Sequence, residues 1–381
     1  FFFGMTGKHD ADWPEVTGMS GGGEYAAHSL SQQACMRLLH AHVRAALRPH
    51  QDSRTRCVLA DYGAADGLAT RQLIEEAVEA GLQQRLDVVL QDLPGNDWQA
   101  AARILSPLGT LDAPSPGQSA PVSVLQMSTE SGHGDVALRL FAAPGTFHVQ
   151  VLPDGSVDLA VSGTALHWLS NGAALPRPGV PVVFHPHVDP TVRAAWDAHA
   201  ARDWKAILVA RAAELRPGGK LIAVLPTLTP DGCSTYSALF DVMDQMLRRA
   251  ESAGRLKVGA REAFAVPASS RSHAAIREGF AQVPSLELEV LEQHVVASPY
   301  YDEAEAGTKA GRAAFARRYV ASVYAWAGPM LQGLAVGEQR DADVFRTEME
   351  GAIAARMEEC KQDYIVSVLV AVKKVGQSHS N

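Results

Sequence analysis

The sequence predicts an α/β fold, a Rossmann-like doubly wound and mostly parallel sheet that carries a helical lid. Short apolar runs alternate with helical patterns over residues 58–226, as in sheets whose parallel strands are joined by helices. The first apolar run ends in Asp61 and passes through a glycine turn into a helix. After Pro226 the alternation stops and helices dominate, so we expect them to cover the carboxyl edge of the sheet as a lid.

The first part of the chain is predicted to form an arm and then one long helix. Residues 1–23 are rich in glycine and aperiodic, which indicates a flexible arm. Apolar residues recur at helical spacing over residues 25–47. Within this helix, Ser29 and Gln32 fit a capping box, and the alternative is that both polar side chains face a ligand.

The alternating region supplies most of the predicted sheet. Strands are predicted at residues 58–60, 88–90, 122–127, 138–141, 157–161 and 220–226, and helices at residues 70–79 and 191–215. Residues 107–121 and 172–190 are rich in proline and are predicted as loops. The Pro217-Gly218-Gly219 sequence is predicted to end the helix before the last of these strands.

The sequence after Pro226 predicts the remaining helices and strands. Helices are predicted at residues 237–253, 270–280, 312–331 and 341–361, and strands at residues 286–296 and 364–373. The chain thus divides into a flexible arm (1–23), an α/β core (24–228), a helical lid (229–285), a core strand (286–297), a segment of lid and core-packing helices (298–361) and a final core strand with the tail (362–381).

Composition excludes several classes of function. The 381 residues are 47% hydrophobic and 20% charged, as in ordinary globular proteins, and the net charge of −8 argues against nucleic-acid and anionic-membrane partners. The longest late apolar run, residues 365–372, is too short to span a bilayer. The four cysteines form no CxxC pair and the N-terminus lacks a signal-peptide pattern, so we expect reduced thiols and a cytoplasmic location, although four cysteines also allow pairing.

A carboxylate follows the second apolar run, and its position suits a nucleoside ligand. Asp92 lies about 25 residues after the glycine turn, and a carboxylate there can accept hydrogen bonds from both ribose hydroxyls. The turn from Gly63 to Gly67 is not the full GxGxxG pattern, and many α/β proteins turn this way without a ligand. The residues alone therefore leave a nucleoside cofactor and a merely structural turn both open.

Several motifs, taken in order, resemble one family. They are GGGEY at residues 21–25 with Ser29 and Gln32, DYG at residues 61–63 with Gly67, DLPGNDW at residues 92–98, PGTF at residues 144–147, LHWLS at residues 166–170, RAAELRPGG at residues 211–219 and YIVSV at residues 364–368. With these motifs the chain resembles the plant-type (SABATH) small-molecule carboxyl methyltransferases, which include salicylate, jasmonate, indole-acetate and caffeine-pathway enzymes. The DLPGNDW and LHWLS motifs are the most specific, because generic α/β methyltransferases share only the first strand and turn.

The resemblance implies a site for S-adenosylmethionine. It places the cofactor over Gly63, with its methionine end among Tyr25, Ser29 and Asp61, its ribose on Asp92 and its adenine beside Leu93, Thr146 and Phe147. Polar residues of the family turn are replaced here by alanines, so the remaining contacts at this turn would come from backbone groups and Asp66.

The resemblance also implies how a small-molecule carboxylic acid is held. Gln32 and Trp168 match the pair that binds the substrate carboxylate, although a tryptophan after a buried strand is more often a core residue. His167 is expected to line the pocket rather than act as a base, and Thr164 replaces an aromatic residue of many relatives, which implies more room. Candidate lid contacts, whose helical spacing suits core packing equally well, are Tyr236, Phe240, Met243 and Phe345.

No metal ion is expected at this site. Some relatives bind magnesium through an Asp-x-Phe-Asn sequence, whereas residues 262–265 here read Glu-Ala-Phe-Ala. His185, His187 and Asp189 have a metal-like spacing, but they lie in a proline-rich loop and are interpreted as structural. Relatives are often dimers, so the resemblance also implies a homodimer.

The chemistry needs few groups. A carboxylate is already ionised near pH 7 and needs no general base to attack a sulfonium methyl group in line. We therefore expect an O-methyltransferase that forms the methyl ester of a small, partly apolar carboxylic acid. The alternatives are N-methylation of a small heteroaromatic ring and a non-catalytic protein that binds S-adenosylmethionine.

Overall fold

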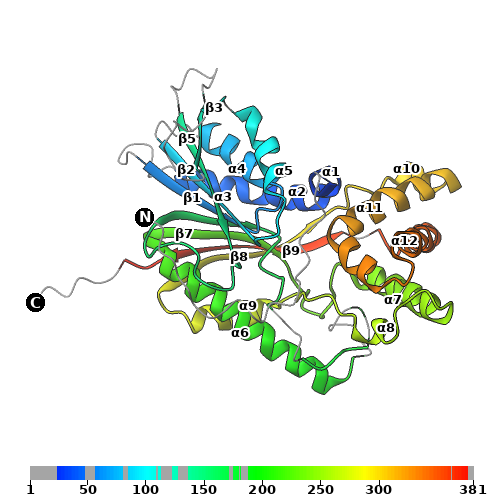
Figure 1. Cartoon of the computed structure of the whole chain (residues 1–381). Coiled ribbons are helices and arrows are strands. Elements are labelled where there is room, and N and C mark those ends of the chain that lie inside the picture. The colour runs from blue at the N-terminus through cyan, green and yellow to red at the C-terminus, as the bar shows by residue number, and fades with distance from the viewer. Residues whose placement is uncertain are drawn as a thin grey trace, which may run out of the picture.

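A computed structural model describes residues 24–47, 56–79, 85–108, 110–112, 122–127, 136–170, 175–179, 181, 188–361 and 363–375. In this part of the chain, a nine-stranded sheet in the order β3-β4-β5-β2-β1-β6-β7-β9-β8 forms the centre of the molecule (Figure 1). Its strands are β1 (Arg56–Tyr62), β2 (Arg85–Asp92), β3 (Thr110–Asp112), β4 (Val122–Met127), β5 (Val136–Pro144), β6 (Val157–Gly163), β7 (Leu215–Pro226), β8 (Leu286–Val296) and β9 (Tyr364–Lys373).

The five central strands are parallel and the margins are antiparallel. β5, β2, β1, β6 and β7 pair in parallel, whereas β4 and β3 on one side and β9 and β8 on the other pair antiparallel. β1 and β2 are buried along nearly their whole length, which explains why they read as continuous apolar runs rather than alternating ones. The predicted doubly wound, mostly parallel α/β sheet is confirmed.

Helices cover both faces of the sheet and one end of it. They are α1 (Glu24–His28), α2 (Leu30–Met36), η1 (Arg37–Leu39), α3 (His40–Leu47), α4 (Leu68–Glu79), α5 (Trp98–Leu105), η3 (Ser106–Leu108), α6 (Pro190–Glu214), α7 (Ser237–Ser252), α8 (Ala260–Ala263), α9 (His273–Ala281), α10 (Glu303–Ala306), α11 (Lys309–Leu334) and α12 (Glu338–Ala355). Figure 1 shows α3, α4 and α5 on one face, α6 and α9 on the other, and α7, α11 and α12 gathered beyond the end of the sheet. No helix of the described residues is long and apolar enough to cross a membrane.

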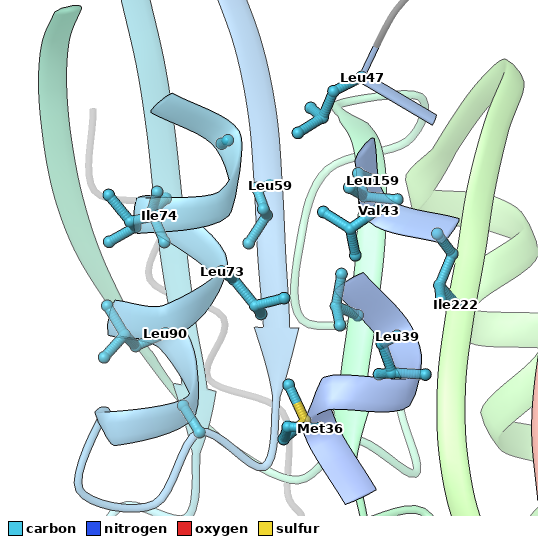
Figure 2. Packing of buried hydrophobic residues seen from close by; sticks show 14 of the residues in the cluster. Met36, Leu39, Val43, Leu47, Leu59, Leu73, Ile74, Leu90, Leu159 and Ile222 are labelled. Atoms are coloured by element: carbon cyan, nitrogen blue, oxygen red, sulfur yellow. The ribbon is translucent and has the colours of Figure 1, made fainter. Parts of the chain in front are cut away.

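The core on the first face shows why these helices form where they do. Leu39 and Val43 of the N-terminal helices and Leu73 of α4 point toward strand residues such as Leu59 and Leu159 (Figure 2). These side chains are at most 2% exposed. Burial of each such aliphatic side chain contributes on the order of 1.5–3 kcal/mol, so the amphipathic faces hold the helices on the sheet.

The predicted single helix over residues 25–47 is wrong in detail. The chain breaks at Ser29, whose backbone angles are φ −90° and ψ 36°, and Ser29 makes no side-chain capping bond. Instead, the Gln33 amide donates to the Ala26 carbonyl at 3.0 Å and to the Ser29 hydroxyl at 3.4 Å. Gln33, and not the Gln32 of the predicted capping box, thus bonds across this break.

Other features also differ from the prediction. α9 was expected in the lid but packs under the sheet, where Phe280 meets the ring of Trp204 at 6.0 Å, because its apolar face matches α6. The Pro217-Gly218-Gly219 sequence does not separate helix from strand: α6 passes directly into β7, and Gly218 takes a positive φ of 80° inside that strand. The last lid helix spans Glu338–Ala355 rather than residues 341–361.

Candidate active site

The glycine turn after β1 brings two loops into close contact. Gly63 has a φ of +79°, and a Cβ atom built on it would lie 2.2 Å from the Cβ of Ala165 in the loop after β6. Only glycine allows both the backbone angle and this approach. Asp61 before the turn is buried, and its Oδ2 accepts a hydrogen bond from the Thr70 hydroxyl at 2.7 Å.

Asp66 connects this turn to the N-terminal helix. Its Oδ2 accepts from the backbone N–H of Ala26 at 2.5 Å, and its Oδ1 accepts from that of Leu68 at 3.4 Å. Asp66 therefore holds α1, and with it Tyr25, against the start of α4. These bonds to the backbone assign Asp66 a structural task, and its contact with a cofactor stays a prediction.

Asp92 organises the turn from the end of β2. Its Oδ2 accepts from the Ala65 N–H and its Oδ1 from the Leu93 N–H, each at 2.7 Å. Ala65 takes a positive φ of 49°, and the Asn96 side chain donates to the Ala65 carbonyl at 2.7 Å. The DLPGND motif thus fixes the backbone of the turn, while each carboxylate oxygen keeps a lone pair for a further donor.

Burial governs the acidity of these carboxyl groups. It raises the pKa of Asp61 to about 7, with the charge of Asp92 adding to the effect and the bond from Thr70 opposing it. Burial also raises the pKa of Asp92, against the bonds from the Ala65 and Leu93 N–H groups. The pair lies at the carboxyl edge of the sheet, where ligands of open α/β sheets bind.

The loop after β5 is held by a fully buried ion pair. Arg211 and Glu214 are 0% exposed and 2.6 Å apart. The Arg211 guanidinium donates to the carbonyls of Phe147 and Val149, at 2.9 and 3.1 Å, and Glu214 accepts from the N–H groups of residues 151 and 152 and from the Tyr62 hydroxyl. This explains the RAAEL part of the family motif: it shapes the loop that carries Thr146 and Phe147.

A cavity opens beside the loop after β6, between the sheet and the lid. It contains about 590 Å³ of empty space, part of it open to solvent. It is lined by Tyr25, Gln32, Thr164, His167, Trp168, Tyr236, Phe240, Val266, Ala268, Ser270 and Trp326. Gln32, Trp168 and the lid residues Tyr236 and Phe240 are therefore brought together, although they come from three distant parts of the sequence.

Of the four expected lid contacts, Tyr236 and Phe240 line this cavity, and their contact with a substrate stays a prediction. Met243 and Phe345 are fully buried in the hydrophobic cluster of the lid helices and do not line this cavity, because their helix faces pack on each other. The lining residues that sequence reasoning missed are Val266, Ala268, Ser270 and Trp326. Trp326 follows the helical periodicity of the buried residues of α11, so the sequence predicts a core residue there and gives no local sign that it lines a cavity.

Aromatic rings form the far wall of the cavity. The ring of Trp326 lies edge-on to Trp168 at 6.1 Å and to Tyr236 at 6.3 Å, and Tyr236 meets Phe240 at 5.9 Å. Such edge-to-face pairs keep the rings in fixed orientations. The wall is therefore a rigid apolar surface suited to a flat or aliphatic group.

Thr164, the first residue after β6, has a strained backbone conformation. It has a φ of 54°, a region that β-branched residues rarely adopt, and its backbone N–H donates to the Val224 carbonyl at 2.8 Å. Its hydroxyl, like the Oε1 of Gln32, is buried without a hydrogen-bond partner among the described residues. Strain and unpaired polar atoms in one cavity are typical of functional sites.

His167 is poorly suited to act as a base. Burial, together with the charge of Arg271, lowers the pKa of its imidazole to about 3. The ring is therefore neutral at physiological pH, and a group of this pKa is a weak proton acceptor there. Arg271 itself is buried, and it donates to the Leu166 carbonyl at 2.9 Å, which helps to hold the loop in place.

Within the described residues, no group of three or more His, Cys, Asp and Glu side chains could hold a metal ion. His185 and His187 of the metal-like spacing lie outside the described residues. Asp189 caps the start of α6 by accepting from the N–H groups of Thr191 and Val192, at 2.8 and 3.4 Å.

The sequence of this chain matches that of a known protein family. A sequence model of the SAM dependent carboxyl methyltransferases matches residues 14–375. The indole-3-acetate O-methyltransferase 1 of Oryza sativa subsp. japonica is 27% identical over 374 residues, which cover 90% of this chain and 88% of that protein. The O-methyltransferase acrG of Aspergillus aculeatus is 29% identical over 234 residues, which cover 58% of this chain and 61% of that protein. The probable 7-methylxanthine methyltransferase 5 of Theobroma cacao is 24% identical over 255 residues, which cover 61% of this chain and 63% of that protein.

A solved structure shares the fold. A loganic acid methyltransferase with SAH superposes with a TM-score of 0.71 at 18% identity, covering 95% of this chain and 100% of that one. The sequence motifs, the shared fold and the family match over nearly the whole sequence all indicate the same family. The chain belongs to the family of S-adenosylmethionine-dependent carboxyl methyltransferases.

Proposed function

We propose that this protein transfers a methyl group from S-adenosylmethionine to the carboxylate of a small, partly apolar acid. The observation that carries the proposal is the cavity that Gln32 and Trp168 line together with the aromatic rings of Tyr236, Phe240 and Trp326. Among the described residues that line it there is no lysine or arginine, so these residues would hold an anionic group by neutral donors. Neutral donors suit a reaction whose methyl donor already carries a positive charge.

The residues of the glycine turn fit the cofactor. Asp92 is held by two backbone N–H groups and keeps lone pairs that can accept from ribose hydroxyls. Tyr25 lines the cavity, and the N–H of the next residue, Ala26, donates to Asp66 of the turn at 2.5 Å, so Tyr25 lies between turn and cavity. Ser29, Asp61 and Gly63 would surround the methionine end, and Leu93, Thr146 and Phe147 the adenine.

In this proposal the chain acts by orientation. When bound, S-adenosylmethionine supplies an electrophilic methyl group on a sulfonium. The Gln32 amide and the Trp168 indole N–H would fix the carboxylate so that one oxygen faces that methyl in line with the sulfur. Orientation of this kind lowers a barrier by about 7–11 kcal/mol, and the aromatic wall would exclude water. The low pKa of His167 agrees with a reaction that needs no general base.

The test is methyl transfer from labelled S-adenosylmethionine to a panel of aromatic, indole and aliphatic acids, with xanthine and nicotinate as nitrogen acceptors. Label that is extracted only with acids and lost on mild alkaline hydrolysis supports the proposal. Alkali-stable label on a nitrogen acceptor would assign N-methylation of a heteroaromatic ring instead; the cacao relative is named a probable 7-methylxanthine methyltransferase. Cofactor binding without any transfer would favour a non-catalytic binding protein.

The homodimer and the cytoplasmic location stay predictions. Sedimentation of the purified protein and fractionation of its source cells would check them.

A further inference from the structure

His148 is a buried histidine that the proposed chemistry does not use. Its side chain is 9% exposed and lies between two loops that line the site. Its Nδ1 lies 2.8 Å from the hydroxyl of Thr146, in the loop after β5, and its Nε2 lies 3.2 Å from the backbone carbonyl of Trp168, in the loop after β6. One imidazole thus joins the wall proposed for the adenine to the residue proposed to hold the carboxylate.

The partners of His148 determine its tautomer. A carbonyl oxygen only accepts hydrogen bonds, so Nε2 carries the proton that it shares with Trp168. The Thr146 hydroxyl oxygen already accepts from the His148 backbone N–H at 3.3 Å, so its own hydrogen is available for Nδ1. A neutral imidazole with the proton on Nε2 therefore satisfies both bonds at once.

Each loop also has bonds of its own that do not pass through the His148 side chain, although the Oδ2 of Asp203 lies 3.8 Å from the Nε2 of His148. Asp203 accepts from the backbone N–H and the hydroxyl of Ser170, both at 2.7 Å, and so holds the end of the Trp168 loop on α6. The Arg211–Glu214 pair holds the loop that contains Thr146. Loss of the His148 bonds should therefore leave both loops folded but no longer fixed relative to each other.

We infer that His148 is a positioning residue that transmits cofactor occupancy from Thr146 to the Trp168 loop. A bound adenine would fix Thr146, and the imidazole would then fix the backbone of Trp168 in the place where its indole meets the acid. This inference rests on the proposed function for the location of the two ligands. It makes the two binding sites couple positively, so that each ligand raises the affinity for the other by the same factor.

Hydrogen exchange of backbone amides measures this coupling without any acid. Trp168 N–H donates to the Ala165 carbonyl at 3.0 Å, Leu169 N–H to the Pro267 carbonyl at 2.8 Å, and Ser170 N–H to Asp203. Their exchange reports opening of the loop. In the unmodified protein, S-adenosylhomocysteine should slow exchange in the peptide over residues 166–170 by about fivefold or more, at the low end of typical site-to-site couplings.

We call this coupling through His148 the relay. Substitutions of His148 distinguish the relay from a merely structural role. His148→Phe fills the space without hydrogen bonds and should abolish the slowing at residues 166–170, while the peptide that contains Asp92 is still protected by S-adenosylhomocysteine. His148→Gln keeps an N–H for the Trp168 carbonyl and should restore part of the effect. Gln150→Ala is the matched control, because Gln150 lies in the same loop and its side chain is bonded, among the described residues, to Leu152 and Asp154 of that loop.

The possible results distinguish failure of the relay from failure of the proposed function. If S-adenosylhomocysteine still protects residues 166–170 fully in His148→Phe, the relay is wrong. It is also wrong if, in the unmodified protein, S-adenosylhomocysteine protects the residues near Thr146 but not residues 166–170. If His148→Phe does not fold, Thr146→Val removes the other end of the relay and must show the same loss. Transmitted protection in a protein that methylates no acid would support the relay and refute the proposed substrate. Failure to bind S-adenosylhomocysteine at all would refute both.

Discussion

At the scale of single residues, Gln32 is the side chain on which the proposed specificity for acids depends. A hydrogen bond to a charged group contributes about 1.5–3 kcal/mol, so Gln32→Ala should lower kcat/KM for the acid by about 10- to 100-fold. The affinity for S-adenosylhomocysteine, measured by titration calorimetry, should change little. Gln99→Ala, which removes an exposed glutamine from α5, is the control and should leave both quantities unchanged. Loss of cofactor binding in Gln32→Ala would refute the proposed clamp.

The pKa of Asp61 leads to a separate prediction, that the affinity for the cofactor depends on pH. Because burial raises its pKa to about 7, the carboxyl group is partly protonated at neutral pH in the protein without cofactor. The ammonium group at the methionine end of the cofactor would favour the ionised form and lower that pKa. Binding therefore releases a proton, and affinity is lost as pH falls below about 7, by up to about tenfold per pH unit.

Titration with S-adenosylhomocysteine from about pH 5 to about pH 8 checks this prediction. The proton release should appear as a dependence of the binding heat on the buffer. Asp61→Asn should bind more weakly at pH 8 and should show no such pH dependence. A dependence that survives in Asp61→Asn would assign the titration to another group.

At the scale of an element, the loop after β5 depends on an ion pair that contacts no solvent. Removal of one partner from a buried pair leaves an uncompensated charge and costs about 3–5 kcal/mol. Glu214→Gln should therefore lower the free energy of unfolding by about that amount, because Arg211 is left with its charge inside the protein. It should also weaken S-adenosylhomocysteine binding, since Thr146 and Phe147 lie in the loop that the pair shapes.

Denaturant unfolding of Glu214→Gln measures the stability, and calorimetry measures the binding. The exposed pair of Lys220 and Glu289, 2.7 Å apart, is the matched control, since exposed ion pairs contribute little. Glu289→Gln should unfold at nearly the same denaturant concentration as the unmodified protein. Equal effects of the two substitutions would contradict the importance of the buried pair.

At the scale of the whole molecule, the site forms where the lid meets the N-terminal helix. The hydroxyl of Tyr300 donates to the carbonyl of His28 at 2.6 Å and so links the lid to α1, beside Tyr25. Tyr300→Phe removes this bond, worth about 1 kcal/mol, and should raise the KM for the acid by about fivefold with little change in Tm. The expected cause is a lid that closes less well over the core.

Tyr301→Phe provides the control for this experiment. The neighbouring Tyr301 hydroxyl donates to Glu358, within the lid and at the surface, so its removal should change neither KM nor Tm. Steady-state kinetics and thermal unfolding of the two variants measure the difference. A KM that rises equally in both, or in neither, would show that the link from Tyr300 to α1 does not control the site.

Local patterns predicted the parts of the site that contiguous residues encode. The Asp61 turn, the DLPGND motif and the carboxyl ends of β1, β2 and β6 follow from runs of apolar residues and the polar residues just after them. Parallel strands place their carboxyl ends at one edge, so the alternation of strands and helices was sufficient to bring Asp61, Asp92 and Trp168 to the same side. These features, and the family, could be derived from the sequence alone.

Only the tertiary structure decided which lid residues line the cavity and how its two walls are joined. Phe240 faces the cavity while Met243, three residues later, is buried among helices, and Trp326 reaches the cavity from α11. Helical periodicity defines an apolar face but does not identify what that face meets, because packing between segments far apart in the chain determines the partner. For the same reason no sequence pattern marks His148, whose bond to the Trp168 carbonyl exists only once the loops after β5 and β6 lie side by side.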